Sequence, residues 1–379
     1  MSIVKHITGA ACQPRKWSVN MRELTVKLTH KTYPILIENN LFQSAGAVIQ
    51  RFFPARKVFI VTDSNLASIY GTVLVEQLAK LSTQAGLYVF PAGEGNKSHE
   101  QLLKMYEAFS QVEITRKDVV VALGGGVTGD LTGFAASTWL RGTGFLQIPT
   151  SLLAMVDSSI GGKVAVNLPV GKNLVGSFYH PEAVLIDPLL LNTLPDRHFS
   201  DGMAEVIKHG CIRDKEMFEW LEELGSRDNF MAHAEEIICR NCDIKRLVVQ
   251  QDERETSLRM ILNFGHTFGH AIEKAFHYEK YTHGESVAMG MVFAAELSCR
   301  LGYCDADVPQ KIRSIVTQYH LPTAWPEVNS EIIQKTVMLD KKAQTDELSL
   351  VLIKSIGEVV LEKFPKERIG GWIDEKSNH

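Results

Sequence analysis

The sequence has 379 residues, of which 45% are hydrophobic and 22% charged, a composition typical of globular proteins and long enough for two domains. Its net charge of -4 and pI near 6.4 exclude a general attraction to nucleic acid or to acidic membranes, so any cationic site must be a local concentration of Lys and Arg. Lys5, His6 and Arg15 interrupt the apolar runs at the N-terminus, so we expect neither a signal peptide nor a membrane span.

The six cysteines are scattered along the chain, and we expect free thiols in a reducing cytosol, hence a cytoplasmic protein. Cys239 and Cys242 form a C-x-x-C inside a helical pattern that runs from Glu235 to Gln251. Because no second pair accompanies them, we favour structural thiols over a metal or redox role.

Residues 1–20 show little periodicity, and we interpret them as an extension without an assigned function. After them, short apolar strands alternate with helices. The pattern predicts strands at 24–28, 35–37, 57–63, 87–90 and 118–123, and helices at 41–52, 65–81 and 99–109. This alternation predicts a nucleotide-binding α/β domain over residues 21–194, with a parallel-rich sheet whose ligands bind at the carboxyl ends of the strands.

Polar or glycine-rich segments follow three of these strands, at 63–65 (DSN), 91–98 (PAGEGNKS) and 124–130 (GGGVTGD). Asp63 can accept hydrogen bonds from two ribose hydroxyls, and the segment 124–130 (GGGVTGD) opens a helix whose amides can cradle a pyrophosphate. Gly124, Gly126 and Gly129 match G-x-G-x-x-G, but the motif follows a late strand and lacks the acid expected about twenty residues further on. We therefore favour a phosphate-binding turn in a different dinucleotide fold over a merely tight turn.

The next polar groups are Asp157, Lys163, Lys172 and Asn173, in glycine-flanked loops. Singly, each is ordinarily a solvated surface residue. Together they indicate a site for an anionic or polyhydroxylated ligand. Past Pro195 the alternation gives way to long helical patterns, which predicts a mainly α-helical metal- and substrate-binding domain over residues 195–379.

The stretch 263–270 (NFGHTFGH) lies in a periodic run from Leu258 to Phe276 that predicts a helix. His266 and His270 would then lie one turn apart, at metal-ligand spacing, although such pairs are as often capping or core residues. Glu205, which shares a predicted helix face with Lys208, supplies a carboxylate. With His266 and His283 it would make a two-His, one-carboxylate zinc site with an open coordination position.

Together, the segments 124–130 (GGGVTGD), 149–163 (PTSLLAMVDSSIGGK), 171–173 (GKN), 202–208 (GMAEVIK), 263–270 (NFGHTFGH) and 283–285 (HGE) resemble the 3-dehydroquinate synthases. The resemblance spans the chain from Met21 to about Lys342. It implies a lyase of the shikimate pathway and of aromatic amino acid biosynthesis, with the family's two-domain fold. Such enzymes convert 3-deoxy-D-arabino-heptulosonate 7-phosphate to 3-dehydroquinate by transient oxidation with NAD, phosphate elimination, re-reduction and aldol cyclisation. NAD, a divalent metal (zinc, with cobalt as the alternative) and a homodimer are implied.

The resemblance also implies residue roles, in which Glu205, His266 and His283 hold the metal and His270 is left as an acid-base group with a pKa near neutrality. Arg259 would clamp the substrate carboxylate, Lys208 and Lys245 would contact carboxylate or hydroxyls, and Asp157 would take hydroxyls. Phosphate would be held by Lys163, Asn173, Asn263, one of Lys341 and Lys342, and Arg141 from a second subunit. The residues implied for NAD are Asp63, Asn65, Glu94, Lys97, Gly125, Gly126, Val127, Asp130, Thr150, Ser151, Lys172 and Thr193.

The sequence departs from the family at His209, where members often carry an aromatic residue. Three alternatives stay open. A related sugar-phosphate cyclase would act on a substrate without a carboxylate, for which Arg259 has no use. A metal-dependent polyol dehydrogenase would accumulate NADH. A nucleotide-binding or structural zinc protein would release no phosphate from a sugar acid.

Overall fold

The computed structural model describes residues 21–54, 56–338 and 346–377. The strands are β1 (Arg22–Lys27), β2 (Thr32–Ile37), β3 (Val58–Asp63), β4 (Ala85–Phe90), β5 (Val119–Gly124), β6 (Gly144–Pro149), β7 (Lys163–Leu168), β8 (Gly171–Phe178), β9 (Ala183–Ile186), β10 (Glu347–Ser355) and β11 (Glu358–Pro365). The α-helices are α1 (Ala45–Phe52), α2 (Thr72–Lys80), α3 (His99–Gln111), α4 (Gly126–Thr138), α5 (Asp196–Arg213), α6 (Lys215–Leu224), α7 (Arg227–Ala232), α8 (Ala234–Gln251), α9 (His266–Ala275), α10 (His283–Arg300), α11 (Asp307–Gln318), α12 (Ser330–Met338) and α13 (Lys366–Ser377). The proposed extension 1–20 lies outside the described residues.

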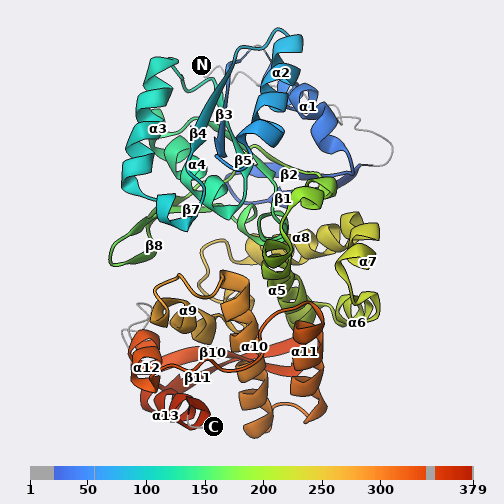
Figure 1. The fold of residues 1–379 in the computed structure, drawn as a ribbon, viewed down its shortest axis with the longest axis vertical. Coiled ribbons are helices and arrows are strands. Elements are labelled where there is room, and N and C mark those ends of the chain that lie inside the picture. Colours follow the sequence, from blue (N-terminus) through green and yellow to red (C-terminus); the bar gives the residue numbers. More distant parts are fainter. Residues whose placement is uncertain (1–20, 55, 339–345, 378–379) are drawn as a thin grey trace, which may run out of the picture.

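A seven-stranded sheet forms the upper half of the molecule in Figure 1, in the order β1-β2-β9-β6-β5-β3-β4. All its neighbouring strands are parallel except β1 and β2, which form an antiparallel hairpin with Arg22 opposite Ile37. The alternation of strands and helices did predict a parallel-rich sheet. The hairpin departs from it because only a short turn joins β1 to β2, and a parallel pairing needs a longer crossover.

The sheet is buried on both faces, as its apolar strands predict. Along β3, Val58 and Ile60 face one hydrophobic cluster, whereas Phe59 and Val61 face another. The first cluster includes side chains of α1 and α2, and the second includes side chains of α3 and α4. These helices therefore hold the carboxyl ends of β3, β4 and β5 in place above the lower half of the molecule (Figure 1).

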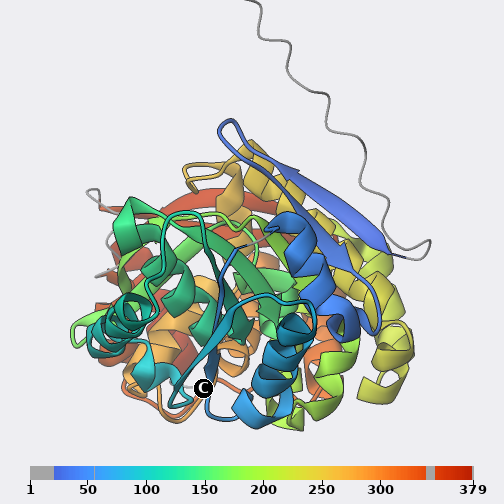
Figure 2. The ribbon, with the colours of Figure 1, turned by 90° about the horizontal axis from the view of Figure 1, so that it is seen from above.

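The lower half contains α9 to α13 and the hairpin β10–β11, while α5 and α8 lie between the halves (Figure 1). Seen from above, the helices of the lower half lie beneath the sheet (Figure 2). The last strand of the sheet, β9, ends at Ile186 and α5 begins at Asp196. The domain boundary near Pro195 stays a prediction. The two-stranded sheet of β10 and β11 in this mainly helical half was not predicted. Among the described residues, these two strands pair with each other.

The expected continuous helix from Leu258 to Phe276 is wrong. Residues Leu258–Asn263 form a 3-10 helix, and α9 begins only at His266. Gly265 separates the two with a φ of 78°, a left-handed conformation that ends a helix. Asn263 therefore does not share a helical turn with the two histidines, although His266 and His270 do lie on one helix.

Candidate functional site

Three ligand-type side chains converge where α5, α9 and α10 meet. Glu205 lies within α5, and His266 and His283 are the first residues of α9 and α10. Glu205 Oε1 lies 3.3 Å from His266 Nε2 and 3.8 Å from His283 Nε2. Among the described residues, this buried oxygen has no hydrogen-bond partner. Two imidazoles around an unsatisfied carboxylate oxygen fit a zinc-type ion with an open fourth position.

Outer contacts orient both imidazoles. His266 Nδ1 lies 3.2 Å from the Phe264 carbonyl oxygen, and His283 Nδ1 lies 3.3 Å from Glu273 Oε2. Each ring therefore turns its Nε2 toward Glu205, which is the arrangement that fixes metal-ligating histidines. The sequence analysis missed Glu273. It lies seven residues after His266 on α9, so helical spacing could have identified it.

Glycines allow α9 and α10 to approach closely enough to bring His266 and His283 together. A Cβ on Gly290 of α10 would lie 2.1 Å from the Gly265 carbonyl oxygen, and one on Gly265 would lie 2.7 Å from the Met291 nitrogen. No larger side chain fits at either position. Gly265 and Gly290 therefore serve the close packing of α9 against α10.

The electrostatic environment of the cluster favours the binding of a cation. Burial alone would raise the pKa of Glu205, but Lys208 and His266 outweigh it and hold this pKa well below the usual range. His283 shows the reverse, since Glu205 and Glu273 outweigh burial and raise its pKa well above the usual value. A metal would therefore displace a proton from His283 when it binds.

His270 borders the cluster, and its ring centroid lies 5.3 Å from that of His266. Desolvation of the ring, followed by the charges of His266 and His283, lowers the pKa of His270 to about 3. The imidazole is thus neutral at pH 7, which is the state of a base, although this pKa lies below the near-neutral value expected from the sequence. His270, Glu273 and His283 are also within ligand reach of one another, but the unpaired oxygen of Glu205 favours the first cluster.

His209, the departure from the family pattern, is fully buried beside this cluster. Its Nδ1 lies 2.9 Å from Asn241 Oδ1, and its Nε2 has no partner among the described residues. Its ligand atom lies within 4.8 Å of those of Asp157 and Glu205. Burial, followed by Lys208, lowers the pKa of His209 to about 4, so it adds no charge to the cleft at pH 7.

Three buried cations lie in the same region, with side chains that the fold holds in defined contacts. Lys208 pairs with Glu205, and Lys245 Nζ lies 2.5 Å from Asp157 Oδ1. Arg259 instead donates to backbone carbonyls, at 2.5 Å to Glu253 and 3.4 Å to Gly161. Burial lowers the pKa of Lys245 to about 8, against the opposing pull of Asp157. Of these cations, Arg259 alone has hydrogen bonds only to carbonyls among the described residues.

Lys163 and Asn263 meet at a residue that the sequence analysis missed. Glu255 forms an ion pair with Lys163 and accepts a hydrogen bond of 2.7 Å from Asn263 Nδ2. Glu255 lies between α8 and the 3-10 helix, with a φ of 59°. Nothing in its sequence context distinguishes it from a solvated loop acid, so only the tertiary structure could place it here.

The remaining phosphate candidates lie apart. Asn173 Oδ1 accepts from Lys97 Nζ at 2.6 Å, on the cofactor side. Arg141 follows α4 and precedes β6, at the amino edge of the sheet, and the structure does not bring it to the cleft. Lys341 and Lys342 lie outside the described residues.

Most of the cofactor candidates lie at the carboxyl ends of β3, β4, β5 and β6, whereas Lys172 lies in β8 and Thr193 ends the 3-10 helix that follows β9. Gly125 to Val127 form the N-terminus of α4, where free amides can hold a pyrophosphate. Lys97 is buried and pairs with Asp130 at 2.5 Å, while Asp63 Oδ1 accepts from the Asn65 amide at 2.9 Å. Further contacts tie the remaining candidates together: Glu94 to Asn167, Thr150 to Gly124, Lys172 to Glu273 and Tyr278, and Thr193 to Tyr70. Ser151 lies beside Gly125.

The described cysteines, including Cys239 and Cys242, are free, whereas Cys12 lies outside the described residues. Among the described residues, no helix combines the length and apolar character that crossing a membrane requires.

Comparisons with known proteins cover nearly the whole chain. Residues 87–201 match the family model of the 3-dehydroquinate synthase N-terminal domain, and residues 202–343 match that of the C-terminal domain. A 3-dehydroquinate synthase of Clostridium beijerinckii is 49% identical over 343 residues, which cover 90% of this chain and 98% of the relative.

Solved structures of similar fold include two enzymes with bound cofactors. A 2-deoxy-scyllo-inosose synthase in complex with carbaglucose-6-phosphate, NAD+ and Co2+ has a TM-score of 0.84 at 26% identity, covering 93% of this chain and 100% of the other. A 2-epi-5-epi-valiolone synthase from Streptomyces hygroscopicus, with NAD+ and Zn2+ bound, has a TM-score of 0.84 at 27% identity, covering 93% and 98%.

Proposed function

We propose that this chain, which belongs to the 3-dehydroquinate synthase family, converts 3-deoxy-D-arabino-heptulosonate 7-phosphate to 3-dehydroquinate and phosphate. It is then a lyase of the shikimate pathway that uses NAD and a divalent metal. The cofactors are supported by the solved structures of similar fold, which hold NAD+ with Co2+ or Zn2+. They are also supported by the unsatisfied oxygen at the centre of the Glu205 cluster.

When bound, NAD supplies reversible hydride transfer and the metal supplies Lewis acidity toward the substrate hydroxyl. Glu205, His266 and His283 would hold the metal, with Glu273 orienting His283. The N-terminus of α4, with Asp63 at the end of β3, would hold the cofactor.

His270 is the group we assign to proton transfer. It is neutral at pH 7, accessible in the cleft and adjacent to the metal ligands, so it can accept the hydroxyl proton without displacing a ligand. Asp157, held by Lys245, would accept hydrogen bonds from substrate hydroxyls. Lys163 and Asn263, which both contact Glu255, would exchange that carboxylate for the substrate phosphate.

Arg259 favours a substrate that has a carboxylate. Its guanidinium is buried, yet its described hydrogen bonds go to the carbonyls of Gly161 and Glu253. Although the carboxylates of Glu255 and Asp157 also act on its charge, a guanidinium whose described hydrogen bonds go to neutral carbonyls can pair with a ligand carboxylate, which matches its planar fork. A phosphorylated sugar acid supplies that carboxylate, whereas a neutral sugar phosphate or a polyol does not.

Arg141 supports a homodimer. Because it lies at the amino edge of the sheet, its own cleft is out of reach, so a role on the phosphate requires a second chain. We therefore propose that two chains associate so that Arg141 of each completes the phosphate contacts of the other.

The decisive experiment mixes the purified protein with the heptulosonate phosphate and catalytic NAD, and follows phosphate release. We expect release that stops on chelation and returns with zinc, without net NADH. Net NADH would instead indicate a polyol dehydrogenase. Release only from a substrate that lacks a carboxylate would indicate another sugar-phosphate cyclase.

A further inference from the structure

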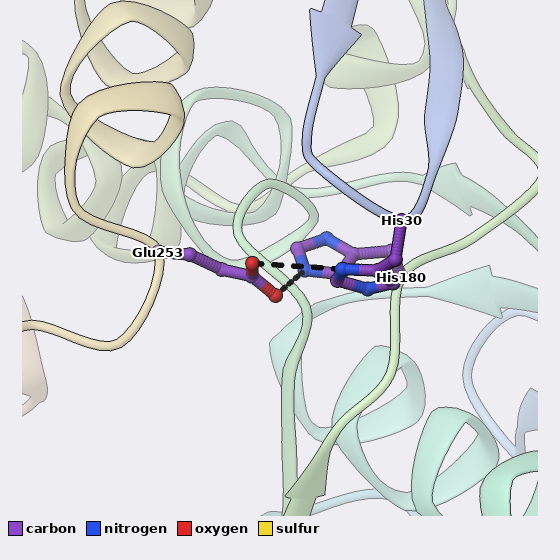
Figure 3. Close-up of side chains that lie close together, drawn as sticks. All are labelled: His30, His180 and Glu253. Atoms are coloured by element: carbon purple, nitrogen blue, oxygen red, sulfur yellow. Dashed lines mark hydrogen bonds and ion pairs between the residues drawn. The ribbon is translucent and has the colours of Figure 1, made fainter.

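A second group of metal-ligating side chains lies outside the cleft. His30 lies in the turn between β1 and β2, His180 lies between β8 and β9, and Glu253 follows α8. Both rings lie beside the carboxylate (Figure 3), with Nε2 of His180 at 3.0 Å and Nδ1 of His30 at 3.8 Å from its oxygens. None of these residues belongs to the Glu205 cluster.

The Glu253 carboxylate lacks a cationic side chain to balance it. Its ion-pair distances among the described residues involve only these two histidines, while the neighbouring Lys31 lies 2.9 Å from Glu182 instead. The group thus places a half-buried carboxylate between two imidazoles, and two imidazole nitrogens with one carboxylate oxygen are a ligand set of zinc.

His180 is held rigidly. Its side chain is 1% exposed, and its Nδ1 has no hydrogen-bond partner. The ring packs against Gly162 so closely that a Cβ there would lie 2.7 Å from it, and against Tyr33 with centroids 5.7 Å apart. A fixed, buried ring is a preorganised ligand, whereas His30, with 59% of its side chain exposed, can adjust to complete the site.

The spacing suits a first-row metal ion. The three ligand atoms lie within 4.8 Å of one another, and ligands at about 2.1 Å from a tetrahedral ion lie roughly 3.4 Å apart, so only a small contraction is needed. The exposed side at His30 leaves room for water in the fourth position. Two imidazoles and one carboxylate favour zinc over calcium or magnesium, which prefer oxygen ligands.

We propose that His30, His180 and Glu253 form a second zinc site, which fastens the β1–β2 turn to the loop after α8. The Glu253 carbonyl oxygen accepts from Arg259 Nη1 at 2.5 Å, and Gly162, which precedes Lys163, rests on the His180 ring. The ion would therefore stabilise the segments that contact Arg259 and precede Lys163, without contacting the substrate. Its role is structural.

Zinc stoichiometry tests the proposal. After dialysis against micromolar zinc, elemental analysis should give about two zinc ions per wild-type chain and about one for His30→Gln or Glu253→Gln. His198→Gln, which alters an exposed histidine on α5, is the matched control and should retain two. Because His30 is exposed, His30→Gln should fold normally and keep its metal-dependent phosphate release.

A thermal measurement accompanies the stoichiometry. Added zinc should raise the Tm of the wild type by about 2 to 5 °C more than that of His30→Gln, since only the wild type gains the brace. One zinc per wild-type chain, or two in both His30→Gln and Glu253→Gln, would overturn the proposal. Either result leaves the synthase assignment untouched, because that assignment depends on phosphate release.

Discussion

The proposed metal ligands and the proposed phosphate contacts are built differently. Glu205, His266 and His283 project from helices, and contacts to Phe264 and Glu273 fix both rings. Lys163 and Asn263 instead lie at element ends, and a loop carboxylate, Glu255, contacts both. The three proposed metal ligands are therefore positioned before any ligand binds. Lys163 and Asn263, by contrast, contact the Glu255 carboxylate until a ligand replaces it.

The largest effect should come from breaking the preorganised side. His266→Ala removes one of three ligands, so we expect bound zinc to be lost and kcat to fall by about 10³-fold or more, since several kcal/mol of Lewis-acid stabilisation disappear. Elemental analysis and phosphate release check this together. A variant that retains zinc would show that the ligand set is wrong.

His270→Ala separates proton transfer from metal holding. We expect it to retain zinc and to lose about 10²- to 10⁴-fold in kcat, the range for removal of an acid-base group. The comparison with His266→Ala is the control, because both changes remove an imidazole from α9. Equal loss of zinc in both variants would contradict the division of roles.

Glu273→Gln weakens the orientation of His283 without removing a ligand. We expect metal affinity to fall about 10- to 100-fold, measured by competition with a chelator. Since Glu273 also contacts Lys172, NAD affinity should be measured in the same samples. Unchanged metal affinity would mean that helix packing alone positions the ring.

A pH profile probes the anion side. Because burial lowers the pKa of Lys245 to about 8, the ammonium is charged below pH 8 and loses its charge above it. We expect KM to rise about fivefold between pH 8 and pH 9 if the charged form binds substrate. Lys245→Arg keeps its charge and should lack this rise. The same inflection in both proteins would assign it to another group.

The smallest effect should come from a change at Glu255. Glu255→Gln removes the charge that competes for Lys163 and Asn263, so inorganic phosphate should bind about three- to tenfold tighter, as calorimetry can measure. Glu327→Gln, in a loop before α12, is the control. Unchanged or weaker phosphate binding would show that Glu255 supports the pocket rather than occupying it.

Much of the architecture could be predicted from local patterns. Alternating apolar strands and helices predicted the parallel-rich sheet, and the glycine turn at 124–130 predicted the N-terminus of α4. Glu205, His266 and His283 were predicted as ligands by chemistry and resemblance, and they do converge. The prediction of the sheet succeeds because strand period and helix spacing are properties of short segments, whereas the ligand assignment stays a prediction.

Other features depended on the tertiary structure. The periodicity from Leu258 to Phe276 is helical throughout, yet Gly265 ends one helix so that α9 can pack against α10. The contacts of Glu255 with Lys163, and of His30 and His180 with Glu253, join segments far apart in the chain. The sequence by itself determined which chemistry the chain carries. Only packing decided which groups meet, because long-range contacts are set by how helices and sheet bury their apolar faces together.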